Sequence, residues 1–114
     1  MSATPPSTFA EFWPEYVEAH SNPGNRLLHA IGTSLGTVSL ALGLATRRPS
    51  LCVLAPISGY GFAWIGHFFL QHNRPATFKH PLWSFAGDYK MFGLMLTGRM
   101  TDELVRLQQR TLQE

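Results

Sequence analysis

Three histidines are spaced so that a helical hairpin would bring their side chains to one level. His29 precedes the bend at Arg47 and Arg48 by about as many residues as His67 follows it. Because an α-helix rises about 1.5 Å per residue, two antiparallel helices joined at this bend place both imidazoles at nearly the same depth. His20 precedes the first helix by a short Ser-Asn-Pro-Gly turn and can reach the same end. Three imidazoles at one level predict a metal site.

Further candidate ligands follow His67 in the chain. His72 points roughly a third of a turn away from the helix face that holds Gln71. His80 lies in a Lys-His-Pro loop, and Asp88 is the carboxylate within the following apolar stretch. Any of the three can add a ligand, but for Asp88 we favour a structural role or a bond that orients an imidazole.

Polar residues surround the predicted site. Gln71 follows His67 by four residues and shares its helix face, but an amide is a poor metal ligand, so we expect it to support the site or to contact a substrate. Four more polar residues occur at the same end of the hairpin: Asn25, Arg26, Asn73 and Arg74. An arginine there is suited to bind a carboxylate with paired hydrogen bonds, or to reach lipid phosphates.

Two long apolar runs must position these side chains. Residues 27–46 and 50–71 contain no Asp, Glu, Lys or Arg. Runs of about 20 apolar residues match the roughly 30 Å hydrocarbon layer of a bilayer. Gly32, Gly36 and Gly43 are the small residues that allow membrane helices to approach closely. The sequence therefore predicts an all-α, integral membrane helical bundle built on a helical hairpin, with a soluble all-helical protein as the alternative.

The remaining segments also predict helices. Thr8 and Glu11 form a capping-box pattern at the start of a short amphipathic helix whose aromatic stripe fits a membrane interface. Asn22 and Pro23 are a good cap and first residue for the first long helix. Residues 81–98 predict a third apolar helix, spanning or interfacial, and residues 101–114 a polar C-terminal helix. Residues 1–7 predict a flexible tail, and we expect no strands.

Composition limits the classes of function. The chain has 114 residues, which predicts a single domain over residues 1–114. Its formal net charge of +2 is too small and too scattered to favour a nucleic-acid partner. Cys52 is the single cysteine, so an internal disulfide is excluded.

Two stretches of the sequence carry a family resemblance. HSNPGNRLLHAIGT (residues 20–33) and GYGFAWIGHFFLQHNRPATFKHPLWSFAGD (residues 59–88) resemble the signature blocks of a family of small helical membrane proteins. That family, once known as a domain of unknown function, includes the fungal endoplasmic-reticulum 2-hydroxy fatty acid dioxygenase. The resemblance implies an Fe(II)-dependent α-oxidation that shortens a 2-hydroxy fatty acid by one carbon. The resemblance matches His20, His29 and His67 to the histidines of the family. This sequence departs from the family pattern at Gln71, where members often have Glu.

Residues and resemblance together favour an enzyme, a non-haem iron dioxygenase acting on a fatty acid or lipid in a membrane. Imidazole suits zinc as well as iron. One alternative is an electron-transfer protein with a non-covalent haem between His29 and His67, and another is a non-catalytic membrane or lipid-binding protein. The expected location is the inner membrane in a bacterium or the endoplasmic reticulum in a eukaryote. The sequence leaves the oligomeric state open.

Overall fold

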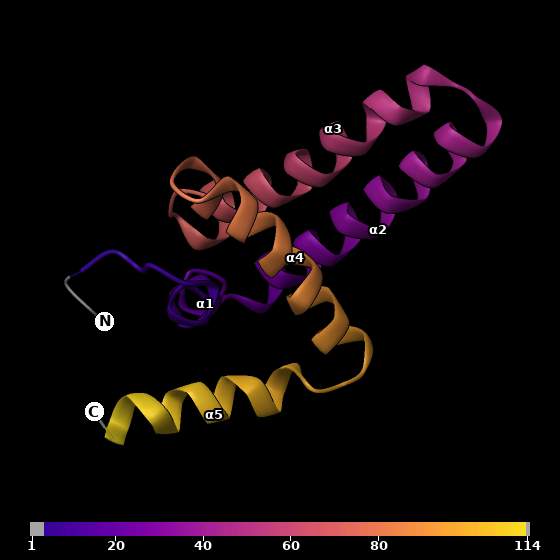
Figure 1. Ribbon diagram of the computed structural model, residues 1–114. Helices are drawn as coiled ribbons and strands as arrows, with labels where there is room; N and C mark the ends of the chain where they lie inside the picture. Colours follow the sequence, from indigo (N-terminus) through magenta and orange to yellow (C-terminus); the bar gives the residue numbers. More distant parts are fainter. Residues whose placement is uncertain (1–3, 114) are drawn as a thin grey trace. The chain divides into compact units, whose positions relative to one another are not determined.

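The computed structural model describes residues 4–113, and every regular element in that range is helical (Figure 1). The elements are α1 (Phe9–Glu18), α2 (Pro23–Thr46), α3 (Pro49–Ile65), the π-helix η1 (Gly66–Gln71), the 3-10 helix η2 (Ala76–Phe78), α4 (Pro81–Leu96) and α5 (Met100–Gln113). The all-α prediction is confirmed for the described residues. Residues 1–3 of the expected flexible tail lie outside them.

Contacts divide the chain into two compact units. The first, which we call the hairpin unit, is His20–Pro75. The second, which we call the terminal unit, combines residues 4–19 with residues 76–113 among those described. All three histidines of the predicted site belong to the hairpin unit.

The hairpin unit is built from α2 and α3, which run antiparallel (Figure 1). Asn22 caps α2 as predicted, because its side-chain oxygen accepts from the main-chain N–H groups of Gly24 (2.8 Å) and Asn25 (3.2 Å). At the other end, Arg47 adopts the left-handed conformation with φ 56°, which turns the chain. Pro49 then begins α3, since proline at the first helical position leaves no hydrogen bond unmade.

Glycines allow α2 and α3 to pack closely. A Cβ atom added to Gly36 would lie 2.9 Å from the main-chain oxygen of Ala55, and one added to Gly43 would lie 2.7 Å from Cys52 Sγ. Both distances are shorter than ordinary van der Waals contacts. The small residues that the sequence analysis singled out therefore lie at the helix interface, where larger side chains would force the helices apart.

Two helices of the hairpin unit are long and apolar enough to cross a membrane: α2, and the continuous helix Pro49–Gln71 formed by α3 and η1. In the most apolar 18-residue stretch of each helix, only 22% (α2) and 17% (Pro49–Gln71) is buried inside the protein. A core helix of a soluble protein is mostly buried. The large apolar side chains exposed on them are Leu27, Ile31, Leu35, Val38, Leu40, Leu42, Leu44, Val53, Leu54, Ile57, Tyr60, Trp64, Ile65, Phe68, Phe69 and Leu70. An exposed apolar surface of this extent marks contact with lipid or with a partner.

The last turn and a half of the second long helix is a π-helix, which the sequence analysis did not predict. In η1 the main-chain oxygen of His67 accepts from the N–H groups of His72 and Asn73, the latter at 3.0 Å. His72 ends the helix in the left-handed conformation, with φ 57°. Single π-turns inside longer helices are frequent at functional sites, and this one carries His67.

In the terminal unit, α1 begins at the predicted cap. Thr8 Oγ1 accepts from the N–H of Glu11 at 3.2 Å. The Glu11 carboxylate accepts from the main-chain N–H and the hydroxyl of Ser7, at 2.8 and 2.9 Å, so its bonds lie one residue earlier than in a standard capping box. The helix continues through Pro14 and ends at Glu18.

The aromatic stripe of α1 forms the core of the terminal unit. Phe12, Trp13 and Tyr16 are buried together with Met91 of α4 and residues of α5. The rings of Trp13 and Tyr16 stack with their centroids 5.5 Å apart. These side chains, which the sequence analysis assigned to a membrane interface, are thus packed inside protein. Their packing holds α1 against α4 and α5 within the terminal unit.

Candidate metal centre

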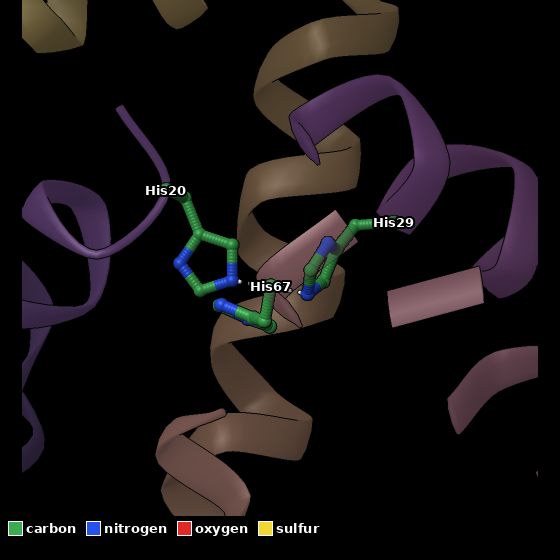
Figure 2. A group of neighbouring side chains, drawn as sticks. All are labelled: His20, His29 and His67. Carbon is green, nitrogen blue, oxygen red and sulfur yellow. Dashed lines mark hydrogen bonds between the residues drawn. The ribbon is translucent and has the colours of Figure 1, made fainter. Parts of the chain in front are cut away.

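The hairpin unit brings His20, His29 and His67 together, with the three rings pointing toward one another (Figure 2). His29 extends from α2, His67 from η1, and His20 from the turn that precedes α2. Their ring centroids lie 4.4 to 4.8 Å apart, and each pair meets nearly edge to face. All three side chains are buried, with exposed fractions of 1%, 4% and 1%. Ring nitrogens that are buried away from water need polar partners. Here one nitrogen of each ring lies within 4.8 Å of a nitrogen of each of the other two rings.

Hydrogen bonds orient two of the rings. His29 Nδ1 lies 2.9 Å from the main-chain oxygen of Asn25, which can only accept, so Nδ1 carries the proton. His67 Nδ1 lies 2.7 Å from Asn73 Oδ1 and donates to it in the same way. In both residues Nε2 therefore keeps its lone pair. Bonds of this kind at the outer nitrogen commonly fix metal-binding histidines.

His20 completes the cluster through its own Nε2, which lies 3.0 Å from Nε2 of His29. Since His29 Nε2 is an acceptor, the hydrogen bond between them needs a proton on His20 Nε2. A metal ion needs the lone pair at that nitrogen instead. To bind a metal through Nε2, His20 would have to carry its proton on Nδ1 instead.

The spacing of the nitrogens suits one metal ion. One ligand nitrogen from each histidine lies within 4.8 Å of the other two. Imidazole nitrogens bound to one ion through bonds of about 2.1 Å lie about 3 to 3.5 Å apart, so side-chain shifts of roughly 1 Å bring all three into place. Among the described residues, this is the group of His, Cys, Asp and Glu side chains that could hold a metal.

As they stand, the rings of His29 and His67 are closer together than two imidazoles that bind a haem from opposite faces. Two imidazoles on opposite faces of a haem need ring centroids about 6 Å apart, since each metal–nitrogen bond is about 2 Å and the macrocycle lies between them. The centroids of His29 and His67 lie 4.8 Å apart, and the ring of His20 occupies the third side.

The segment that carries His20 is bonded to both long helices. Arg26 Nη1 donates to the main-chain oxygens of His20 (2.8 Å) and Ser21 (3.0 Å). Gln71 Oε1 accepts from the N–H of Asn22 (2.8 Å), and Gln71 Nε2 donates to the hydroxyl of Ser21 (2.6 Å). The sequence analysis expected Arg26 to bind a carboxylate or to reach lipid phosphates, and Gln71 to support the site or to contact a substrate. In the structure both side chains bind the turn before α2.

No carboxylate occurs in the sequence of the hairpin unit, residues 20–75. A divalent ion held by three neutral imidazoles would keep its full positive charge in a buried setting, where an uncompensated charge is costly. The donor set therefore fits a metal that binds together with an anion from outside the hairpin unit.

Comparison with models of protein families identifies the family of this chain. Residues 6–100 match the family model described as 2-hydroxy-palmitic acid dioxygenase Mpo1-like. The chain belongs to the Mpo1-like family. This membership confirms the resemblance seen in the two sequence blocks, and the matched range contains all three clustered histidines. Searches of curated proteins and of solved structures gave no match.

Two further histidines of this Mpo1-like chain lie outside the cluster. His72 is exposed at the end of η1, where its left-handed backbone ends the helix. His80 belongs to the terminal unit and packs against aromatic rings, with its centroid 5.1 Å from Trp83 and 5.3 Å from Phe12. Neither histidine is in the group of side chains that could hold a metal. As metal ligands, both stay predictions from the sequence alone.

Asp88, the candidate carboxylate, is bonded inside the terminal unit. The hydroxyl of Tyr16 donates to Asp88 Oδ1. Burial, and secondly the Asp88 charge, raise the pKa of Tyr16 well above its ordinary value, so the phenol stays protonated and keeps donating. Burial also raises the pKa of Asp88 to about 6, against the opposing effect of the Tyr16 hydrogen bond. The bond to Tyr16 is a structural contact of Asp88 inside the terminal unit, and a part of Asp88 in a metal site stays a prediction.

The raised pKa of Asp88 predicts a pH-dependent stability. The folded protein binds this proton more tightly than the unfolded chain does, so stability should fall as pH rises from about 4 to about 6. The full effect is of the order of 2 to 3 kcal/mol. In Asp88→Asn, thermal unfolding in detergent should lose this part of the pH dependence. The bond to Arg106, as the largest cause, lowers the pKa of Glu103 to about 2, so this group makes stability rise with pH up to about 5, but it does so equally in both proteins and cancels in the comparison. Identical pH profiles for the two proteins would contradict the assignment.

Proposed function

We propose that this protein is a membrane-embedded dioxygenase that acts on 2-hydroxy fatty acids, with one metal ion, iron, held by His20, His29 and His67. The observation that carries the proposal is the convergence of three buried imidazoles in a chain of the Mpo1-like family. The family description names the substrate class and the reaction type, and the cluster supplies a place for the metal that oxygen chemistry needs.

The apolar surface of the hairpin unit supports the membrane location. Its two long helices expose leucine, valine, isoleucine and aromatic side chains along their length. A fatty acid partitions into the same hydrocarbon layer, so its chain can approach these helices from the bilayer. Arg74 directly follows Asn73, which orients His67, so its positive charge is a candidate to bind a carboxylate head group at that end of the hairpin.

The proposed reaction is balanced without an added reductant. A 2-hydroxy fatty acid and O₂ give the fatty acid one carbon shorter, CO₂ and water. The bond between the carboxyl carbon and the hydroxyl-bearing carbon breaks, both carbons are oxidised, and O₂ takes up four electrons and the protons released. Iron when bound supplies the means to activate O₂ and to bind the substrate oxygens.

The residues of the chain have separate roles in this proposal. The Asn25 main-chain oxygen and the Asn73 side chain hold the outer nitrogens of His29 and His67, so that both Nε2 atoms keep their lone pairs facing the centre. The neutral ligand set favours an anionic substrate, because a carboxylate balances the charge of the ion. A 2-hydroxy acid offers a carboxylate and a neighbouring hydroxyl that can bind together, which a simple fatty acid lacks.

Direct assay of the products tests the proposal. The purified protein in lipid nanodiscs, loaded anaerobically with Fe²⁺, should convert 2-hydroxy-palmitic acid and O₂ to pentadecanoic acid, with about one O₂ consumed per product. Palmitic acid without the hydroxyl group should give no product. Bound iron without turnover of 2-hydroxy acids of any chain length would refute the proposed reaction, and a folded protein that binds no metal would refute the proposed site.

A further inference from the structure

His20 differs from the other two histidines in how the fold holds it. His29 and His67 extend from helices, whose main-chain hydrogen bonds fix the position of each Cα atom. His20 lies in the turn between α1 and α2, outside any helix. A ligand in a turn loses more conformational freedom on binding a metal than one on a helix does, unless other bonds already hold the turn.

Gln71 supplies such bonds from the helix that carries His67. One amide group satisfies two different groups of the turn: its Oε1 accepts from the N–H of Asn22, and its Nε2 donates to the hydroxyl of Ser21. A second donor, Asn25 Nδ2, lies 3.4 Å from the same Oε1. Ser21 and Asn22 directly follow His20 in the chain, so Gln71 restrains the main chain next to the third histidine.

Arg26 completes the restraint from the other helix. Its Nη1 bonds the main-chain oxygens of His20 and Ser21, and it lies on α2 one turn before His29. The turn is therefore bonded on one side to the helix of His29 and on the other side to the helix of His67. This arrangement links the position of His20 to the positions of both other rings.

We propose that Gln71 is a positioning residue that holds His20 in place at the metal site. The inference rests on the proposed metal site and extends it to a residue that need not touch the metal. A side chain that orients a ligand commonly changes metal affinity by about 10- to 100-fold when removed. Gln71→Leu should have an effect of that size, because it removes both hydrogen bonds while keeping a side chain of comparable volume.

Cobalt titration provides the test, since Co²⁺ binds imidazole and its absorption spectrum reports the ligands around it. We expect Gln71→Leu to weaken Co²⁺ binding by about 10- to 100-fold. Gln71→Glu should stay within a few-fold of the wild type, because a carboxylate oxygen can accept from the N–H of Asn22 and from the hydroxyl of Ser21. Ser21→Ala removes one of the two bonds with little risk to folding, and it should weaken binding by a smaller factor. The control variant Gly61→Ala, on the same long helix as Gln71 and with no atom within 4 Å of the added Cβ atom, should bind like the wild type.

A double-mutant cycle separates positioning of His20 from a general effect on the fold. In the His20→Ala background, Gln71→Leu should weaken Co²⁺ binding no further, because the ligand that it positions is gone. An equal loss in both backgrounds would overturn the proposal, as would wild-type affinity in both Gln71→Leu and Ser21→Ala. A wild-type protein that binds no Co²⁺ would instead refute the proposed metal site itself.

Discussion

Replacement of any one of the three clustered histidines by alanine is expected to lower the rate of 2-hydroxy fatty acid turnover by at least about 100-fold. Loss of a residue that only orients a ligand costs about 10- to 100-fold, so loss of the ligand itself should cost more. The expectation applies equally to His20, His29 and His67, because each contributes one ring to the same buried group. Product formation by each iron-loaded variant, measured by mass spectrometry, checks it.

His72 provides the matched control for these variants. It belongs to the same unit and lies five residues after His67, but it is exposed and outside the cluster. His72→Asn keeps a residue that tolerates the left-handed conformation and should turn over substrate like the wild type. If His72→Asn were as inactive as the cluster variants, or if a cluster variant kept wild-type turnover, the assignment of the ligands would be wrong.

Gly66→Ala is expected to disrupt the metal site although it adds a single methyl group. A Cβ atom on Gly66 would lie 2.0 Å from Asn25 Oδ1, which cannot occur without movement. Asn25 is fully buried, and its main-chain oxygen holds Nδ1 of His29, while Gly66 directly precedes His67. The added group should therefore displace two of the three rings. We expect a loss of stability of about 1 to 3 kcal/mol and a loss of metal affinity of at least about tenfold.

Another glycine of the same long helix controls for the change of residue type. A Cβ atom on Gly61 would meet no atom within 4 Å, so Gly61→Ala should leave metal binding unchanged and stability unchanged or slightly improved. Thermal unfolding and Co²⁺ titration of both variants in the same detergent make the comparison. Equal behaviour of Gly66→Ala and Gly61→Ala would show that Asn25 and Gly66 are not packed as described.

The elements of the fold that follow from local sequence rules could be predicted. The charge-free runs on either side of Arg47 and Arg48 indicated two long helices, and equal distances from that bend indicated that His29 and His67 would meet. The Asn22–Pro23 pair marked the start of α2 correctly. These features depend on helix periodicity and capping, which act over a few residues.

The features that depend on packing could not be predicted. The π-turn of η1 leaves no signal in a pattern of apolar residues, although it sets where Gln71 and Asn73 lie relative to His67. The aromatic stripe of α1 looked suited to a membrane interface, because a sequence pattern gives the apolar face of a helix but not what covers it. The contact between Tyr16 and Asp88 joins residues far apart in the chain, and no local rule pairs them.

Metal analysis of the wild-type protein tests the central claim most directly. The protein is purified anaerobically in detergent, supplied with Fe²⁺, freed of unbound ions, and examined for metal content and for its visible spectrum. We predict close to one iron per chain and no haem absorption band, with a marked loss of iron in His29→Ala. A folded wild-type protein that retains no metal, or one that carries haem, would contradict the claim that three histidines hold a non-haem ion in this chain.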